Sequence, residues 1–351
     1  MSEALKSRRD MLKLLGAAPL IATGRSATEA AAQSSTPSEK PQLALVSRHL
    51  QWTSMEEGAA IAAEAGFHAI AWTVRPGAHM EPEHVERDLP KAVDIARKAG
   101  LATPMLITAI VDAQSPRAEA ILDTMRSAGI RRYRAPSFRY DYRGDLNQQW
   151  EALKPRVAGL VKLNEKYGTT AMYHTHSGPG NVGGGVWDLW LLVKDFDPRY
   201  VGLNFDVGHA TARGGAEWIE TSHFAHRHVH ALSLKDFRWV KKSELAPSDP
   251  TPGRYGSSPT WPWVTQFVPP GEGMVNFRDI FAYFQSVGFS GPLETYFEYF
   301  VNVPGQPPVD MLGTDFGKWK LEMPKSQFIS LLQRDVKFYN ALLTETKLGS
   351  A

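Results

Sequence analysis

The chain has 351 residues, with 39 Lys and Arg against 37 Asp and Glu and a formal net charge of +2 at pH 7. It contains no cysteine, which excludes disulfide bridges, thiolate metal sites and cysteine nucleophiles. A charge this close to zero argues against nucleic acid as a partner, because binding to a phosphate backbone requires a basic stripe.

The first 32 residues have the features of an export signal. Two adjacent arginines, Arg8 and Arg9, stand in the twin-arginine pattern Ser-Arg-Arg-Asp-Met-Leu-Lys, and a short apolar run and three alanines follow. The apolar run is shorter than the roughly 20 residues that cross a bilayer. We therefore expect a twin-arginine signal peptide over residues 1–32 and a disordered spacer over 33–41. The mature protein is expected to be periplasmic or secreted and to leave the membrane once the signal is removed.

Strand-like and helix-like patterns alternate from residue 42 to about residue 345. The expected strands are 42–50, 67–74, 101–110, 130–138, 169–176, 200–206, 229–237 and 292–300. The expected helices are 54–65, 84–99, 115–128, 145–167, 184–195, 214–226, 276–287 and 326–345. A glycine stands between helix and strand at five of these transitions, where a helix closes in a left-handed conformation.

Eight alternations predict the α/β fold of a (β/α)8 TIM barrel, formed by a single domain over residues 42–345 with a tail at 346–351. The alternative is a doubly wound open sheet. That fold more often has five to seven strands, and no G-x-G-x-x-G pattern follows the first strand here.

Ionisable residues gather where strands five to eight are expected to end, and these ends form the active face of a barrel. His174 and His176 lie at the end of strand five, and Asp206 ends strand six with His209 three residues later. Asp206 has two interpretations, as a site carboxylate or as the cap of the following helix. Imidazole and carboxylate groups suit Mn, Mg, Co or Zn, and the alternative is a hydrogen-bonded barrel mouth without metal.

Strand seven carries ionisable residues at both of its ends. Lys235 lies in its last part and is expected either to hold a substrate carbonyl or oxyanion, or to pair with a neighbouring carboxylate. His228 and His230 lie at its start, on the face of a barrel that serves stability, and are expected to be structural.

The long loop 238–273 after strand seven is rich in tryptophan. Loops beyond about 15 residues are usually functional lids or disordered, and three tryptophans favour an ordered lid. Indole faces suit stacking on a sugar ring, so Trp239 and Trp261 are candidate substrate-binding residues.

Several motifs make the chain similar to the sugar phosphate isomerase/epimerase family, the xylose-isomerase-like TIM barrels. Phe205–His209 resembles the Asp-x-x-His motif of strand six, and Leu234–Asp236 resembles the end of the His-x-Lys-Asp motif of strand seven. Residues 288–292 leading to Glu298 resemble the last helix-to-strand turn and the Glu-containing strand. The resemblance implies a divalent metal held by Glu, Asp, His and Glu from strands five to eight, and a ketose, aldose or cyclitol as substrate.

The chain departs from that pattern at several ligands. His174 stands where the family has the strand-five Glu, Ser233 replaces the strand-seven His, and Tyr296 aligns with the strand-eight Glu. Asp206 carries over as a ligand, with His209 and Lys235 as substrate contacts. We therefore expect His174, Asp206 and Glu298 to bind one divalent cation.

The remaining roles follow from this expected metal site. The catalytic candidates are His176, Lys235 and Glu298, with Glu298 or His176 as the base, and the substrate-binding candidates are His209, Trp239 and Trp261.

The expected function is an exported enzyme that abstracts a proton next to a carbonyl of a sugar or keto-sugar. The outcome can be isomerisation, epimerisation or β-elimination. The alternative is a non-catalytic carbohydrate-binding barrel that kept the pocket after losing ligands. The sequence specifies neither the sugar nor the oligomeric state.

Overall fold

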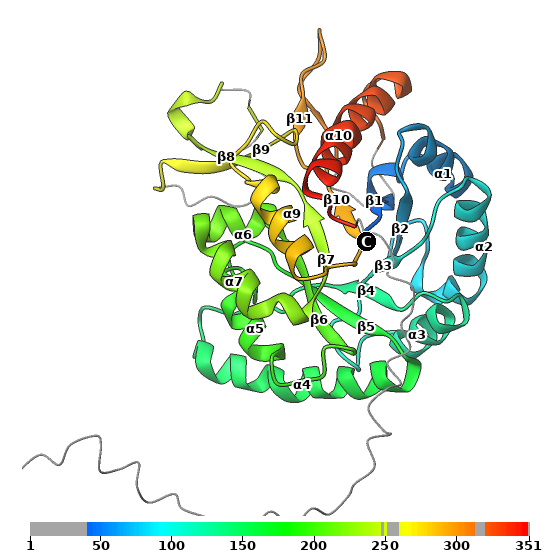
Figure 1. Cartoon of the computed structure of the whole chain (residues 1–351), viewed down its shortest axis with the longest axis vertical. Helices are drawn as coiled ribbons and strands as arrows, with labels where there is room; N and C mark the ends of the chain where they lie inside the picture. The colour runs from blue at the N-terminus through cyan, green and yellow to red at the C-terminus, as the bar shows by residue number, and fades with distance from the viewer. Residues whose placement is uncertain (1–40, 247–248, 251–259, 313–319, 350–351) are drawn as a thin grey trace, which may run out of the picture. The chain divides into compact units, whose positions relative to one another are not determined.

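The computed structural model describes residues 41–246, 249–250, 260–312 and 320–349. The expected signal peptide and nearly all of the spacer lie outside the described residues, as does part of the tryptophan-rich loop. Eight parallel strands form a closed barrel in the order β1-β10-β7-β6-β5-β4-β3-β2 (Figure 1). The first and last strands of the barrel pair with each other, which confirms the predicted TIM barrel.

The barrel strands are shorter than the sequence patterns indicated. They are β1 (Leu43–Val46), β2 (Ala69–Val74), β3 (Met105–Thr108), β4 (Arg132–Ala135), β5 (Thr170–His174), β6 (Val201–Asp206), β7 (Val229–Leu234) and β10 (Leu293–Thr295). Their inner faces carry mostly small or unbranched side chains, among them Ala44, Ala71, Met105, Met172 and Ala231, and these fill the barrel interior. Their outer faces pack on the helices and form the larger apolar core.

Helices surround the barrel (Figure 1). They are α1 (Met55–Glu64), α2 (Val85–Lys98), α3 (Ala118–Ser127), α4 (Leu146–Tyr167), α5 (Trp187–Val193), α6 (Val207–Gly214), α7 (Trp218–Ala225), α9 (Phe277–Ser286) and α10 (Lys325–Thr346). All five glycines that were expected to close helices have positive φ angles, from 65° to 89°. None of the described helices is both long and apolar enough to cross a membrane.

Two parts of the chain differ from the predicted pattern near the barrel mouth. One helix was expected at 214–226, but α6 begins directly after β6, and its N-cap is Asp206, which accepts the backbone N–H of His209. The expected strand 292–300 ends at Thr295, because its pairing with β7 stops at Leu234. Glu298 therefore lies in the segment after β10.

The tryptophan-rich loop contains an antiparallel hairpin of β8 (Asp236–Lys241) and β9 (Trp263–Val268). Asp236 binds the backbone of residues 271–275, which follow the second strand of this hairpin. Its carboxylate accepts four backbone N–H groups, from Phe237 at 2.8 Å, Gly271 at 2.9 Å, Gly273 at 3.0 Å and Val275 at 3.1 Å. A Cβ on Gly273 would lie 2.1 Å from this carboxylate, so only glycine allows the approach. Asp236 thereby fixes the segment that follows Lys235.

Candidate functional site

A chain of buried hydrogen bonds crosses the barrel below its mouth. Arg134 on β4 donates to Glu294 Oε1 on β10 at 2.7 Å, and Asn204 Nδ2 on β6 donates to Glu294 Oε2 at 2.6 Å. The other end of the Asn204 amide, Oδ1, lies 2.7 Å from His174 Nδ1 on β5. Because Oδ1 can only accept, His174 carries its proton on Nδ1 and presents a lone pair on Nε2.

His174 Nε2 faces a second atom that lacks a hydrogen bond. Asp206 Oδ2 lies 3.6 Å away, and both atoms are buried with no hydrogen-bond partner among the described residues. Oδ2 also lies 3.0 Å from Lys235 Nζ, so the two groups form an ion pair. The Lys235 ammonium therefore balances the charge on Oδ2, while His174 Nε2 keeps a buried lone pair without a partner among the described residues, which is costly.

Lys235 is the charged centre of the site and comes directly after β7. Its ammonium donates to Glu298 Oε1 at 2.8 Å, and its Nζ lies 3.2 Å from His209 Nε2. Two cations contact the Tyr296 ring, since Lys235 Nζ is 4.8 Å and the Arg134 guanidinium 4.7 Å from its centre. Burial alone would lower the pKa of Lys235, but Asp206 and Glu298 outweigh it and raise that pKa, so the ammonium is charged.

Two more imidazoles line the same face with defined tautomers. His176 Nδ1 accepts from the backbone N–H of Gly178 at 3.1 Å and from Asn181 Nδ2 at 3.0 Å, so its proton is on Nε2. His209 Nε2 accepts from Lys235, so its Nδ1 donates to Ser177 Oγ at 2.9 Å. The two rings are 4.0 Å apart between centroids.

Burial sets the protonation state of this cluster. It lowers the pKa of His174, His176 and His209 well below the usual range, and the nearby Lys235 charge adds to that effect. Near neutral pH all three imidazoles are neutral, the form that binds a metal ion or accepts a proton. Burial raises the pKa of Asp206, an effect that Lys235 opposes.

Every ionisable side chain that the sequence placed at the mouth is brought together here: His174, His176, Asp206, His209, Lys235 and Glu298. The described residues contain one group whose ligand atoms lie within 4.8 Å of one another, formed by His174, Asp206 and His209. Glu298 is outside that group.

Both candidate tryptophans belong to the hairpin region of the long loop. Trp239 lies in β8, and Trp261 lies two residues before β9. Trp239 is 39% exposed and Trp261 is 56% exposed. Phe267 in β9 is the aromatic residue of the hairpin that contacts the site, with its ring centre 5.7 Å from that of His209.

Sequence reasoning did not assign roles to Arg134, Asn204 or Glu294. The parity of β6 does place Asn204 on the same face as Asp206, and Glu294 lies on the strand of the expected Glu motif. Their role depends on contacts between strands that lie far apart in the sequence, which no local pattern shows. Asp236, adjacent to Lys235 in the motif, proves to be an anchor of the backbone.

The chain is similar in sequence to one described protein family and to a group of curated enzymes. Residues 51–312 match the family described as the xylose isomerase-like TIM barrel. Inosose dehydratase 2 of Bacillus cereus is 28% identical over 151 residues, which cover 41% of this chain and 45% of that protein. The chain therefore matches less than half the length of this curated relative.

Solved structures share the fold at low sequence identity. The IolI protein with a bound zinc atom has a TM-score of 0.61 and 13% identity, and the similarity covers 88% of this chain and 100% of that one. L-ribulose 3-epimerase has a TM-score of 0.56 and 13% identity, covering 88% and 96%. At this identity the similarity establishes the fold.

Proposed function

The chain belongs to the xylose isomerase-like TIM barrel family, and we propose that it is an enzyme that removes a proton next to a carbonyl group of a sugar or keto-sugar. The observation that carries the proposal is the juxtaposition of a buried carboxylate, Glu298, with the ammonium of Lys235 at 2.8 Å in the barrel mouth. The similarity to a dehydratase and to an epimerase supports it, because both names describe reactions of this chemical class.

The residues present fit a divalent metal ion. His174 Nε2 and Asp206 Oδ2 are buried without hydrogen bonds and are 3.6 Å apart, a spacing compatible with two ligands of one ion. His209 is the third ligand of the proposed site. Bound there, a metal would polarise a substrate carbonyl as a Lewis acid. His209 Nε2 also accepts from Lys235, so the ammonium and an ion would use the same lone pair.

The side chains divide the proton chemistry between them. Glu298 is the proposed base, because a carboxylate accepts a proton, whereas His176 carries its proton on Nε2 and acts as a donor to the substrate. Lys235 balances charge that develops on the substrate oxygen. Phe267 and Tyr296 form apolar walls beside Lys235, which limit the access of water.

Substitution of Asp206 tests the proposal. Candidate sugars and keto-sugars are incubated in D2O, and NMR records deuterium incorporation or elimination at the carbon next to the carbonyl. We expect wild-type protein to exchange at least one substrate, and Asp206→Ala to lose both exchange and retained metal. If some sugars bind but none incorporates deuterium or undergoes elimination, the result supports the alternative, a non-catalytic carbohydrate-binding barrel. If the active wild type is free of metal and insensitive to chelators, the metal assignment fails.

Lys235→Met separates the ammonium from the metal. We expect the variant to retain a divalent ion more tightly, since the competing cation is gone, while turnover falls by about two orders of magnitude. Metal content and exchange rate are measured on the same samples, with the exposed Lys194→Met as control. Unchanged turnover would remove Lys235 from the catalytic set.

Export is the second part of the proposal. The twin-arginine pattern and alanine run support removal of residues 1–32 and a periplasmic or secreted location. Mass spectrometry of protein from the native cell envelope is expected to find a chain that lacks these residues. An intact N-terminus would contradict export.

A further inference from the structure

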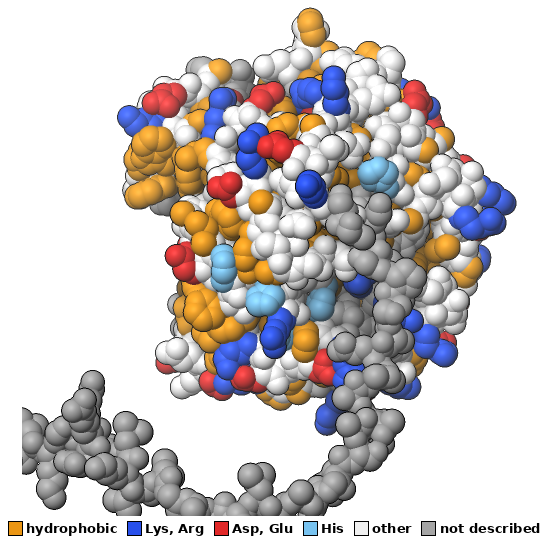
Figure 2. Space-filling view, in the orientation of Figure 1, with side chains coloured by type: hydrophobic (Ala, Val, Ile, Leu, Met, Phe, Trp, Pro, Cys, Tyr) orange, Lys and Arg blue, Asp and Glu red, His pale blue; other side chains and the backbone are white. Residues whose placement is uncertain are grey.

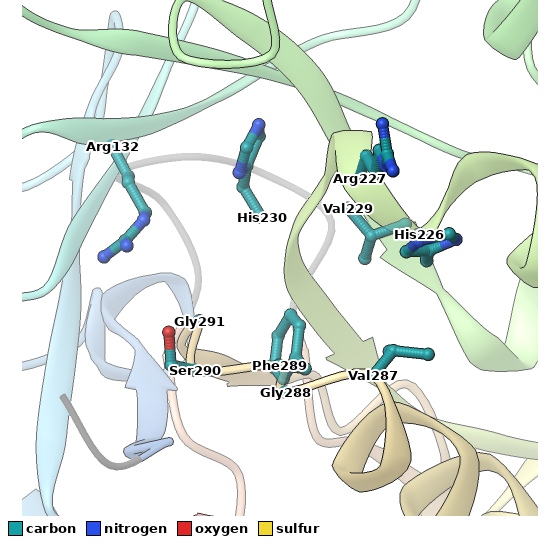
Figure 3. Close-up of a pocket in the computed structure, with 10 residues that line it drawn as sticks. All are labelled: Arg132, His226, Arg227, Val229, His230, Val287, Gly288, Phe289, Ser290 and Gly291. Atoms are coloured by element: carbon teal, nitrogen blue, oxygen red, sulfur yellow. The ribbon is translucent and has the colours of Figure 1, made fainter. Parts of the chain in front are cut away.

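Glu298, the proposed base, lies beyond the part of its chain that the barrel sheet holds. The start of β10 is fixed by the tight turn before it, where a Cβ on Gly291 would lie 2.1 Å from the His230 carbonyl oxygen. Figure 3 shows these two residues at the turn that leads into β10. The pairing of β10 with its neighbours ends at Thr295. The position of Glu298, three residues later, therefore depends on contacts outside the barrel sheet.

The residues on either side of Glu298 are held by groups outside the barrel strands. The backbone N–H of Phe297 donates to His49 Nε2 at 3.2 Å. Tyr299 is held through its side chain, because its hydroxyl donates to Asp335 Oδ2 on α10 at 2.5 Å. Tyr299 is 2% exposed and Asp335 is 1% exposed, so water does not compete for this hydrogen bond. Helix α10 is thereby linked to the residue next to Glu298.

Asp335 is a buried carboxylate that the proposed chemistry does not use. On the visible face of the molecule, Lys and Arg side chains lie among Asp and Glu side chains in contact with solvent (Figure 2). The carboxylate of Asp335 is instead buried, and its hydrogen bonds to described residues come from Tyr299 and from Arg334 Nε of the same helix, at 2.8 Å. Burying a carboxylate costs free energy, and an apolar residue in its place is often equally stable or more so. Stability of the fold alone therefore gives no reason for a carboxylate at this position.

We propose that Asp335 and Tyr299 are positioning residues for Glu298. This inference rests on the proposed function, in which Glu298 is the base. The hydrogen bond between Asp335 and Tyr299 fixes the chain next to Glu298, whose carboxylate then lies 2.8 Å from Lys235 Nζ. Neither positioning residue acts on the substrate. Helix α10, which lies outside the barrel, thus sets the geometry of the proton transfer, and the rate of such a step depends steeply on where the base is held.

Tyr299→Phe tests this role, because it removes one hydroxyl and keeps the ring. Crystal structures of wild type and variant measure the distance from Glu298 Oε1 to Lys235 Nζ, and deuterium exchange from D2O into the sugar measures turnover. We expect this distance to exceed hydrogen-bond reach, about 3.5 Å. We also expect kcat to fall about tenfold with KM and retained metal unchanged, because only the base is displaced.

Two substitutions of Asp335 separate positioning from stability. Asp335→Asn keeps a hydrogen bond to Tyr299 in either orientation of its amide, because the hydroxyl can donate to the amide oxygen or accept from the amide NH2. Its kcat is therefore expected to stay close to that of wild type. Asp335→Leu has the same branched shape but no hydrogen bond, so we expect it to remain folded in urea titrations while its kcat falls as in Tyr299→Phe.

The matched control is Tyr167→Phe, which removes a tyrosine hydroxyl that donates to the exposed carboxylate of Glu119 at 2.7 Å, and it should behave as wild type. In Tyr299→Phe, a contact between Glu298 and Lys235 that stays at 2.8 Å would overturn the proposal, and so would a wild-type kcat. An equal fall of kcat in Asp335→Asn and Asp335→Leu would also overturn it. If the wild type turns over no sugar, the proposed function fails, and the distance measured in Tyr299→Phe still decides whether Tyr299 positions Glu298.

Discussion

At the scale of single residues, the orientation of one amide determines what the barrel mouth can bind. Asn204 has a donor at one end and an acceptor at the other. Glu294 accepts from the donor end, so the acceptor end must face His174. The result is a bare Nε2 on His174 next to Asp206. A residue that touches no substrate thus selects the tautomer of a proposed metal ligand.

Glu294→Gln tests this positioning role. Gln can accept from Arg134 but then directs N–H groups at Asn204, so the Asn204 amide rotates and its Nδ2 faces His174. His174 must then carry its proton on Nε2, and we expect the variant to lose retained metal although Glu294 is outside the metal group. Unfolding should also become easier by about 3 kcal/mol, because a buried arginine loses its counter-charge.

Metal content per folded protein and 15N NMR of the His174 ring are the measurements for this variant. The exposed Glu119→Gln, which removes an ion pair with Lys166, is the control. A variant that is merely destabilised would keep its metal and the Nδ1-protonated tautomer, and that result would contradict the positioning role.

At the scale of elements, the hairpin of β8 and β9 depends on the single carboxylate of Asp236. Four backbone N–H groups converge on it, and the residue before it is Lys235. In the Lys-Asp motif, Lys235 is therefore a charged residue of the site, and Asp236 next to it holds residues 271–275, which follow the hairpin. Phe267, on the second strand of the hairpin, lies against His209 at 5.7 Å between ring centres.

Asp236→Asn is expected to loosen this segment. An amide has one acceptor oxygen where the carboxylate has two, and its NH2 group would face two backbone N–H donors. We expect a loss of about 2 kcal/mol of stability, with faster hydrogen exchange at residues 269–275 and slower turnover. Asp195→Asn, at an exposed side chain, is the control. Unchanged exchange at 269–275 would show that the hairpin is held by other contacts.

At the scale of the whole molecule, the features that could be predicted from the sequence are those that depend on local residue patterns. Alternating apolar runs and helix-closing glycines were sufficient for the barrel, its order and the face that carries Asp206 and Lys235. The sequence did not predict the hairpin strands or the end of β10 at Thr295, because these boundaries follow from pairing with other strands. The capping of the following helix was one of the two interpretations of Asp206, and α6 begins at Val207, earlier than the expected helix 214–226. The Arg134–Glu294 pair joins residues 160 positions apart, beyond the reach of any sequence period.

Buried neutral histidines make the stability of the whole molecule dependent on pH. His49 is the clearest case, because it is fully buried and is not one of the proposed metal ligands. Its Nδ1 donates to the Met311 carbonyl at 2.9 Å, and its Nε2 accepts from the Phe297 N–H at 3.2 Å. Burial lowers its pKa to about 4, against about 6.5 in an unfolded chain.

The direction in which pH changes the free energy of unfolding follows from which state, folded or unfolded, binds the proton. Between about pH 6.5 and pH 4 the unfolded chain binds a proton at His49 and the folded chain does not, so the free energy of unfolding falls as the pH falls through this window. Asp335 acts oppositely, since burial raises its pKa to about 6 and the folded state holds that proton from about pH 6 downward. For His49 alone the loss from pH 7.5 to pH 5 is about 2 kcal/mol.

Urea unfolding at pH 7.5 and pH 5 measures this loss in wild type and in His49→Gln. Gln keeps a donor and an acceptor for Met311 and Phe297 but does not titrate in this range. We expect the variant to be less stable than wild type at pH 7.5, because its amide fits the imidazole site imperfectly, yet to lose about 2 kcal/mol less on acidification. An identical loss in both proteins would mean that His49 is protonated in the folded state at pH 5, and that the neutral imidazole does not connect Met311 to Phe297 in solution.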